Sequence, residues 1–137
     1  MEKLHLYLVR HCESLGNREN IFQGQLDLDI SATGEKQLAL LALRFRNIPI
    51  DAVYSSPLKR AYKTAEAVDL YHSLPIIKLP ELMEVDVGAL SGMKLDKAFS
   101  DYPVFAEKWQ NSPQNCIFPE GETTAEVYDL SLIHISE

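Results

Sequence analysis

The chain has 137 residues, of which 46% are hydrophobic and 24% charged, and its formal net charge at pH 7 is -7. This length suits one domain with a buried core and is too short for two ordinary domains, and the composition excludes a disordered chain. The acidic balance argues against nucleic acid or an anionic membrane as the partner, since both require an excess of lysine and arginine.

The cysteine content and the length of the N-terminal apolar run bear on the cellular compartment of the protein. Two cysteines, Cys12 and Cys116, do not make a disulfide framework. The apolar run over residues 4–9 is too short for the core of a signal peptide or for a membrane span. We therefore expect a protein of the reducing cytoplasm without a membrane partner.

The first half of the chain alternates predicted strands with predicted helices. Residues 4–9 are almost continuously apolar, which is typical of a strand covered on both faces of a parallel sheet. A helix with Thr33 as its N-cap follows, and residues 50–56 predict a second strand. Ser56 and Pro57 predict the start of the next helix, and residues 74–79 predict a third strand.

The second half of the chain is predicted to be mainly helical. Residues 94–113 predict two helical pieces broken near Pro103, and Thr123 and Glu126 have the spacing of a capping box. Alternating strands and helices predict an α/β fold, with a mostly parallel sheet between layers of helices. In such sheets the functional crevice lies beyond the C-terminal ends of the strands.

Four charged or titratable residues fall at comparable places along this pattern. Arg10 and His11 follow the first predicted strand, Arg60 lies in the first turns of a helix, and Glu84 follows the third strand. Guanidinium groups near a helix N-terminus suit a phosphoryl group, a neutral imidazole can attack phosphorus, and a carboxyl group can protonate the leaving oxygen. The sequence contains no cysteine and histidine cluster with metal-ligand spacing and no P-loop, so we expect neither a metal nor another cofactor.

Four ordered motifs resemble those of one family, over residues 4 to about 129. They read LVRHCES, SSPLKRAYKTAE, LMEVDVGALSG and FPEGET in this sequence. They are similar to the signatures of the histidine phosphatase superfamily, also called phosphoglycerate mutase-like. The stretch NRENIFQGQLDLDISATG also fits the loop that follows the first strand in that family. The resemblance implies a three-layer α/β/α fold.

The resemblance also implies a role for each matching residue. His11 is expected to be the nucleophile that becomes phosphohistidine, with Arg10 and Arg60 binding the phosphate. Glu84 is expected to donate the proton to the leaving group, and Glu81 is a competitor that fits the motif less well. Three loop residues are expected to line the phosphate and substrate site: Asn17, Gln23 and Gly24.

The chain departs from the family pattern at two places. Cys12 stands where glycine is usual, which indicates an ordinary backbone conformation and a small space-filling side chain. The family also has a second histidine in a later strand, and His134 does not fit that position because too few residues separate it from Gly121 to form a helix, a turn and a strand. The second catalytic histidine is therefore expected to be missing.

The last eight residues, LSLIHISE, match what a transposase adaptor used in preparing sequencing libraries would encode. We therefore expect residues 1–129 to be a partial histidine phosphatase domain, incomplete at its C-terminus, and residues 130–137 to be a non-native tail. Without its last strands the fragment is expected to be unstable or nearly inactive.

The sequence thus predicts a phosphomonoester hydrolase that acts on a small phosphorylated metabolite. A phosphoglycerate mutase and a non-catalytic phosphate-binding module are the alternatives, and neither the substrate nor the oligomeric state follows from the sequence. Other polar or aromatic residues are expected to have structural or solvent-facing roles rather than catalytic ones. His5 and His72 are expected to be structural or solvent-facing, Trp109 with Phe105 to serve in core or lid packing, and Asp27 with Asp29 to be solvated loop residues.

Overall fold

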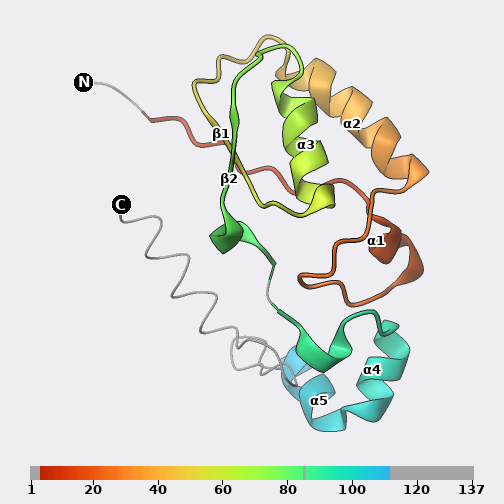
Figure 1. Cartoon of the computed structure of the whole chain (residues 1–137). Helices are drawn as coiled ribbons and strands as arrows, with labels where there is room; N and C mark the ends of the chain where they lie inside the picture. The colour runs from red at the N-terminus through yellow and green to blue at the C-terminus, as the bar shows by residue number, and fades with distance from the viewer. Residues whose placement is uncertain (1–3, 85, 112–137) are drawn as a thin grey trace.

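A computed structural model describes residues 4–84 and 86–111 of the chain (Figure 1). Two short 3-10 helices, η1 and η2, separate the second strand from the last helices. The elements run in the order α1 (Leu15–Glu19), α2 (Ala32–Phe45), β1 (Val53–Ser55), α3 (Lys59–Asp69), β2 (Ile76–Lys78), η1 (Pro80–Leu82), η2 (Gly88–Leu90), α4 (Leu95–Asp101) and α5 (Pro103–Asn111).

Strands β1 and β2 form a parallel pair, and α3 is the crossover between them. Val53 is opposite Ile76 and Ser55 is opposite Lys78. Helix α3 packs against both strands and against α2, so the two helices lie side by side next to the pair (Figure 1). The predictions of strands within residues 50–56 and 74–79 and of a parallel α/β arrangement are confirmed.

The prediction of a strand over residues 4–9 is wrong in this structure. The segment is extended, makes no strand pairing among the described residues, and leaves Leu4 93% and Leu8 88% exposed. Tyr7 contacts Phe45 edge-on, with 5.8 Å between the ring centroids. An apolar run predicts a strand buried on both faces only where neighbouring strands and helices cover it, and no described element covers this one.

Two helices begin at residues other than those predicted. Helix α2 is capped by Ser31, whose hydroxyl accepts from the Gly34 N–H at 3.0 Å, and not by Thr33. Helix α3 begins at Lys59, after Leu58, and Ser56 instead accepts from the Leu58 N–H at 3.3 Å within the preceding turn. Both differences move the N-cap position by two residues, an error typical of helix ends predicted from sequence.

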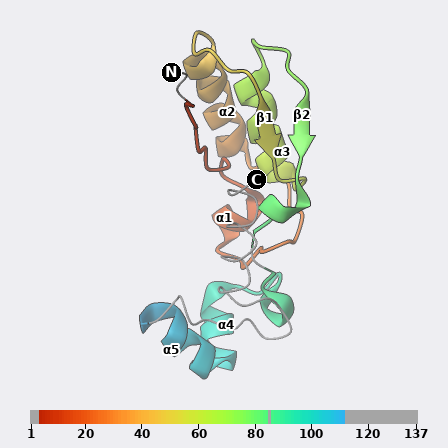
Figure 2. The ribbon, with the colours of Figure 1, turned by 90° about the vertical axis from the view of Figure 1, so that its left-hand side faces the viewer.

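The helices α4 and α5 form the other end of the molecule, away from β1 and β2 (Figure 2). Helix α4 ends before Pro103 and α5 begins at it, which confirms the predicted break. Phe22 packs here against Phe105 and Trp109, with ring centroids 5.8 and 5.7 Å apart. The predicted packing of Trp109 with Phe105 is observed, with their rings 5.8 Å apart, and Phe105 is buried whereas Trp109 is 38% exposed at the edge of the cluster. Leu90, fully buried, belongs to the same aromatic cluster.

Several sequence features lie outside the described residues: the capping box at Thr123 and Glu126, Cys116, and residues 130–137. None of the helices that the structure describes is both long and apolar enough to span a membrane.

Candidate active site

A cavity of about 280 Å³ lies beyond the C-terminal ends of β1 and β2. It brings together His11, Arg60 and Glu84, three residues that are far apart in the sequence. A second cavity of about 230 Å³ also contacts His11 and is lined by Arg10. Arg10 itself is exposed, so it lies next to the first cavity rather than in its lining. The remaining residues that line the first cavity are Ser56, Leu58, Ala61, Glu81, Leu82 and Met83.

The His11 ring is oriented by a contact with the backbone of the next residue, Cys12. Its Nδ1 lies 2.6 Å from the carbonyl oxygen of Cys12, and a carbonyl can only accept, so this nitrogen carries the proton in the neutral ring. The other nitrogen, Nε2, is then the atom with a free lone pair. A neutral imidazole with this tautomer has the form of a nucleophile or a base.

The residues that follow His11 are tied to the two helices. The Cys12 N–H donates to the Thr64 hydroxyl of α3 at 3.0 Å, and the carbonyl of Glu13 accepts from the Ser31 N–H at 3.0 Å. Gly34 in the first turn of α2 is so close that a Cβ atom there would lie 2.2 Å from the Glu13 carbonyl oxygen. The turn after His11 is therefore fixed in place by α2 and α3.

Arg60 is buried at the start of α3, with 3% of its surface exposed. Its guanidinium donates to the carbonyl of Leu26 at 2.8 Å and to that of Gly24. Burial lowers the pKa of Arg60, while the nearby carboxylates of Glu84 and Asp27 act in the opposite direction. Arginine stays protonated in proteins, so the cavity has a fixed positive charge on this side.

Glu84 lies at the exposed side of the cavity, and Glu81, in η1, lines the same cavity. The backbone carbonyl of Glu84 accepts from the Gln25 side chain at 3.3 Å. Both residues line the cavity, and of the two only Glu84 is among the carboxylates that act on the pKa of Arg60, which favours Glu84 over its competitor Glu81.

The three loop residues predicted to line the phosphate site do not line this cavity. The Asn17 side chain accepts from the Ser14 N–H at 3.0 Å as part of the capping box of α1. Gln23 is buried and accepts from the Ser14 hydroxyl at 2.7 Å. Gly24 has a φ of 49°, a conformation that favours glycine, and contributes only its carbonyl to Arg60. In this structure these residues support the loop next to the site.

Asp27 is exposed and the side chain of Asp29 is 45% exposed, as expected of solvated loop residues, but both also contact α3. Asp27 accepts from the backbone N–H of Lys59 at 2.7 Å. Asp29 forms an ion pair with Lys63 at 2.6 Å, and this contact lowers the pKa of Asp29 and raises that of Lys63. Both aspartates therefore connect the loop to α3.

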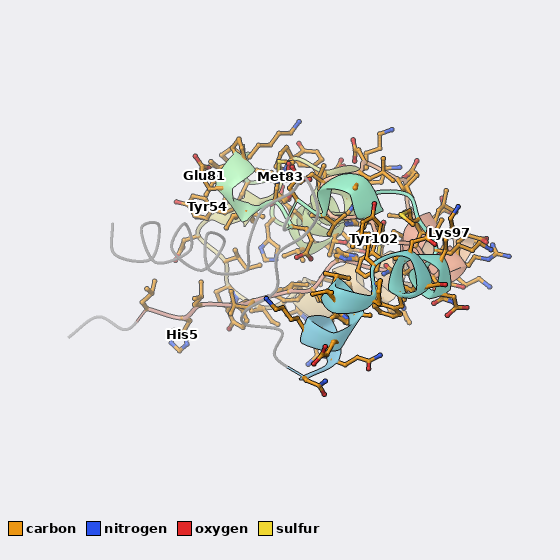
Figure 3. All side chains as sticks on the ribbon, turned by 90° about the horizontal axis from the view of Figure 1, so that it is seen from below. His5, Tyr54, Glu81, Met83, Lys97 and Tyr102 are labelled. Atoms are coloured by element: carbon orange, nitrogen blue, oxygen red, sulfur yellow. The ribbon has the colours of Figure 1, made fainter. Side chains whose placement is uncertain are left out.

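The other polar residues keep the roles expected of them. Cys12 is buried, and it is not among the described residues with positive φ, so it occupies the usual glycine position with ordinary backbone angles. The His72 ring contacts the carbonyl oxygen of Phe45 at 2.8 Å. His5 projects from the exposed N-terminal segment, well away from Glu81 and Met83 (Figure 3).

Within residues 4–84 and 86–111, no three histidine, cysteine, aspartate or glutamate residues are grouped so that they could hold a metal ion.

The sequence of the chain matches the model of the histidine phosphatase superfamily (branch 1) over residues 6–130, and the chain belongs to this superfamily. "Phosphoserine phosphatase 1" of Hydrogenobacter thermophilus is 40% identical over 124 residues, which are 90% of this chain and 59% of that protein. The "Probable phosphoglycerate mutase GpmB" of Yersinia pestis is 32% identical over 90% of this chain and 58% of that protein.

Solved structures show the same fold. YhfR of Bacillus stearothermophilus superposes with a TM-score of 0.86 at 26% identity, over 93% of this chain and 63% of that one. The alpha-ribazole phosphatase of Shigella flexneri gives a TM-score of 0.85 at 25% identity, over the same shares. The predicted α/β, phosphoglycerate mutase-like fold is confirmed. The chain spans about three fifths of the length of the curated relatives that it matches.

Reasoning from the sequence missed two parts of the site. Ser56 and Met83 line the cavity, and the serine pair of the second motif, directly after a strand, was a signal for the first of them. The loop that Arg60 holds was also missed. Its partners are more than thirty positions away, and no local pattern reports contacts over that distance.

Proposed function

We propose that this chain supplies the catalytic groups of a phosphomonoester hydrolase that works through phosphohistidine. The observation that carries the proposal is the single cavity that contacts His11, Arg60 and Glu84. Nε2 of His11 attacks phosphorus, and the bond from phosphorus to the leaving oxygen breaks. Arg60 and Arg10 neutralise the charge on the phosphoryl oxygens, and Glu84 gives its proton to the leaving oxygen. Water then attacks phosphorus, the bond from phosphorus to Nε2 of His11 breaks, and the proton that the water loses returns to Glu84, so inorganic phosphate is released and the site is restored.

The substrate we propose is a small phosphorylated metabolite, and phosphoserine is the first to test because a relative at 40% identity is named for it. We place the reaction in the cytoplasm. The resemblance implies a second histidine that the chain as written does not contain, so we propose that its turnover is slow although the nucleophile is in place. For this reason the test measures the phosphorylated protein as well as turnover.

Trapping of labelled phosphate tests the proposal. The protein is mixed with radiolabelled phosphoserine or an aryl phosphate, quenched in alkali and digested, and the labelled peptide is identified. We expect label on His11, none in His11→Ala, and undiminished label in the control His5→Ala, whose histidine is exposed and remote from the cavity. Label that persists in His11→Ala, or that is absent from the unaltered protein, contradicts the proposal.

The same experiment separates the two alternatives. A phosphoglycerate mutase, the activity for which a relative at 32% identity is named, would transfer the label to a second phosphoglycerate. We expect such an enzyme to depend on a bisphosphoglycerate primer. A non-catalytic module would bind inorganic phosphate with no label on His11.

A further inference from the structure

The loop over residues 24–29 and the first turn of α3 hold each other by contacts that run in both directions. From the loop, the Asp27 carboxylate accepts from the Lys59 N–H at 2.7 Å. From the helix, the next residue, Arg60, donates to the carbonyls of Leu26 and Gly24. Two consecutive helix residues are thus fixed by one short stretch of loop.

Asp27 does for α3 what a capping residue normally does. The residue at the N-cap position, Leu58, has no side chain that can accept, and the structure gives α3 no side-chain cap from that position. The first N–H groups of a helix need acceptors, and a carboxylate there is favoured by the helix dipole as well. Asp27 supplies that acceptor from 32 positions earlier in the chain.

The orientation of Arg60 depends on this arrangement. An arginine side chain has five N–H donors in one rigid plane, so two hydrogen bonds to backbone carbonyls fix where the others point. Arg60 lines the cavity that also contacts His11, and its remaining donors are those available to a ligand there. A shift of the Lys59 backbone would move the whole plane, because Arg60 is the next residue.

We propose that Asp27 is a positioning residue for phosphate binding: its carboxylate caps α3 from the loop and thereby sets the guanidinium plane of Arg60 toward the phosphoryl group. This inference rests on the proposed function, since it needs a phosphoryl group at Arg60. Asp27 does not line the cavity and so acts through its neighbour rather than on the substrate. Arg60 stays protonated when Asp27 is altered, but the nearby carboxylate that acts on it is lost, so a variant that removes this charge and keeps the cap is needed to separate the two effects.

The test measures the affinity of the full chain for inorganic phosphate, by 31P NMR titration or calorimetry, in four variants. Asp27→Ala removes the cap, Asp27→Asn keeps an oxygen that accepts from the Lys59 N–H, and Asp27→Glu keeps the charge but displaces it by one methylene. Asp29→Ala is the matched control, because it removes the other aspartate that joins the same loop to α3. The thermal midpoint of each variant is recorded alongside.

We expect Asp27→Ala to bind phosphate roughly tenfold more weakly, which corresponds to about 1.4 kcal/mol and lies within the range for loss of a helix cap. Asp27→Asn should stay within about threefold of the unaltered protein, and so should Asp29→Ala. If Asp27→Ala does not fold, Asp27→Glu tests the inference instead. We expect it to bind phosphate more weakly than the unaltered protein while its thermal midpoint is nearly unchanged. Equal affinities throughout, or equal losses in Asp27→Ala and Asp29→Ala, overturn the inference. Phosphate binding without label on His11 instead contradicts the proposed function, and the order of affinities still decides the role of Asp27.

Discussion

The two sides of the candidate site are supported very differently. His11 follows residues 4–9, whose side chains are exposed, whereas Arg60 is 3% exposed and bonded to a loop that itself packs at both ends. Phe22, which comes just before this loop, packs in the hydrophobic cluster that includes Leu90 and Phe105. The loop itself contacts α3 through Asp27. His11 is therefore held by the turn after it, and Arg60 by the loop carbonyls to which it donates. Binding and chemistry should respond separately to substitutions on the two sides.

The largest loss of stability is expected from a substitution of Phe22, on the packed side of the site. Phe22→Ala removes a ring that contacts Phe99, Phe105 and Trp109, and we expect a loss of about 3–5 kcal/mol in the free energy of unfolding. Urea unfolding followed by circular dichroism measures it. Phosphate affinity should fall as well, because Phe22 anchors the loop that Arg60 holds. A loss below about 1 kcal/mol would mean that the cluster does not support the site.

The second prediction compares how substitutions of the two arginines, Arg60 and Arg10, change stability and phosphate binding. Arg60→Ala leaves the carbonyls of Gly24 and Leu26 without their charged donor, so we expect about 2–3 kcal/mol less stability in addition to weaker phosphate binding. Arg10→Ala, at an exposed position, should weaken phosphate binding and change the unfolding free energy by less than about 0.5 kcal/mol. Equal losses of stability in both variants would remove the distinction between the two sides.

A smaller effect is expected on the exposed side. Leu8→Ser should change the unfolding free energy by less than about 0.5 kcal/mol, because Leu8 is 88% exposed. The same chemical change at the fully buried Leu90 is the control and should cost several times more. If Leu8→Ser were as costly as the control, the apolar segment would be covered in solution and both sides of the site would be packed.

The smallest effect concerns pH and the ion pair of Asp29 with Lys63, whose side chains are 45% and 39% exposed. The pKa of Asp29 lies below its usual 3.8 and that of Lys63 above its usual 10.5. The pair therefore stabilises the fold between these values. Its contribution is lost as the pH falls through the lowered pKa of Asp29 or rises through the raised pKa of Lys63. The stability difference between the protein and Asp29→Asn, measured from pH 7 down to pH 2, should be small and vanish at the acid end. A difference that grows toward acid would contradict the assignment.

What the sequence predicted, and what it did not, follows from the range of the contacts involved. The strands β1 and β2 and the break at Pro103 were predictable because composition and proline act locally. Arg60 and Glu84 were expected near one another because they follow the predicted strands that became β1 and β2, whereas His11 was expected at the end of a strand that the structure does not show. The exposure of residues 4–9 was not, since an apolar run does not report whether neighbouring elements cover it.

The roles of the loop residues could not be predicted for a related reason. Asp27 and Gln23 look like any polar loop residues, and their partners, Lys59 and Ser14, are chosen by the tertiary structure. Asn17 and Gly24 were assigned to the phosphate site by resemblance alone, and in this structure they hold the loop that borders it.

Gly34 has a consequence for how this sequence tolerates change. It does not line the cavity that contacts Arg60, yet a single methyl group there would collide with the carbonyl of Glu13, two residues after His11. In a library of random variants selected for activity, position 34 would be as intolerant as a position that touches the substrate. Intolerance at this glycine would reflect the close spacing between α2 and the turn after His11. Positions at which substitutions abolish activity would therefore include residues that do not line the cavity.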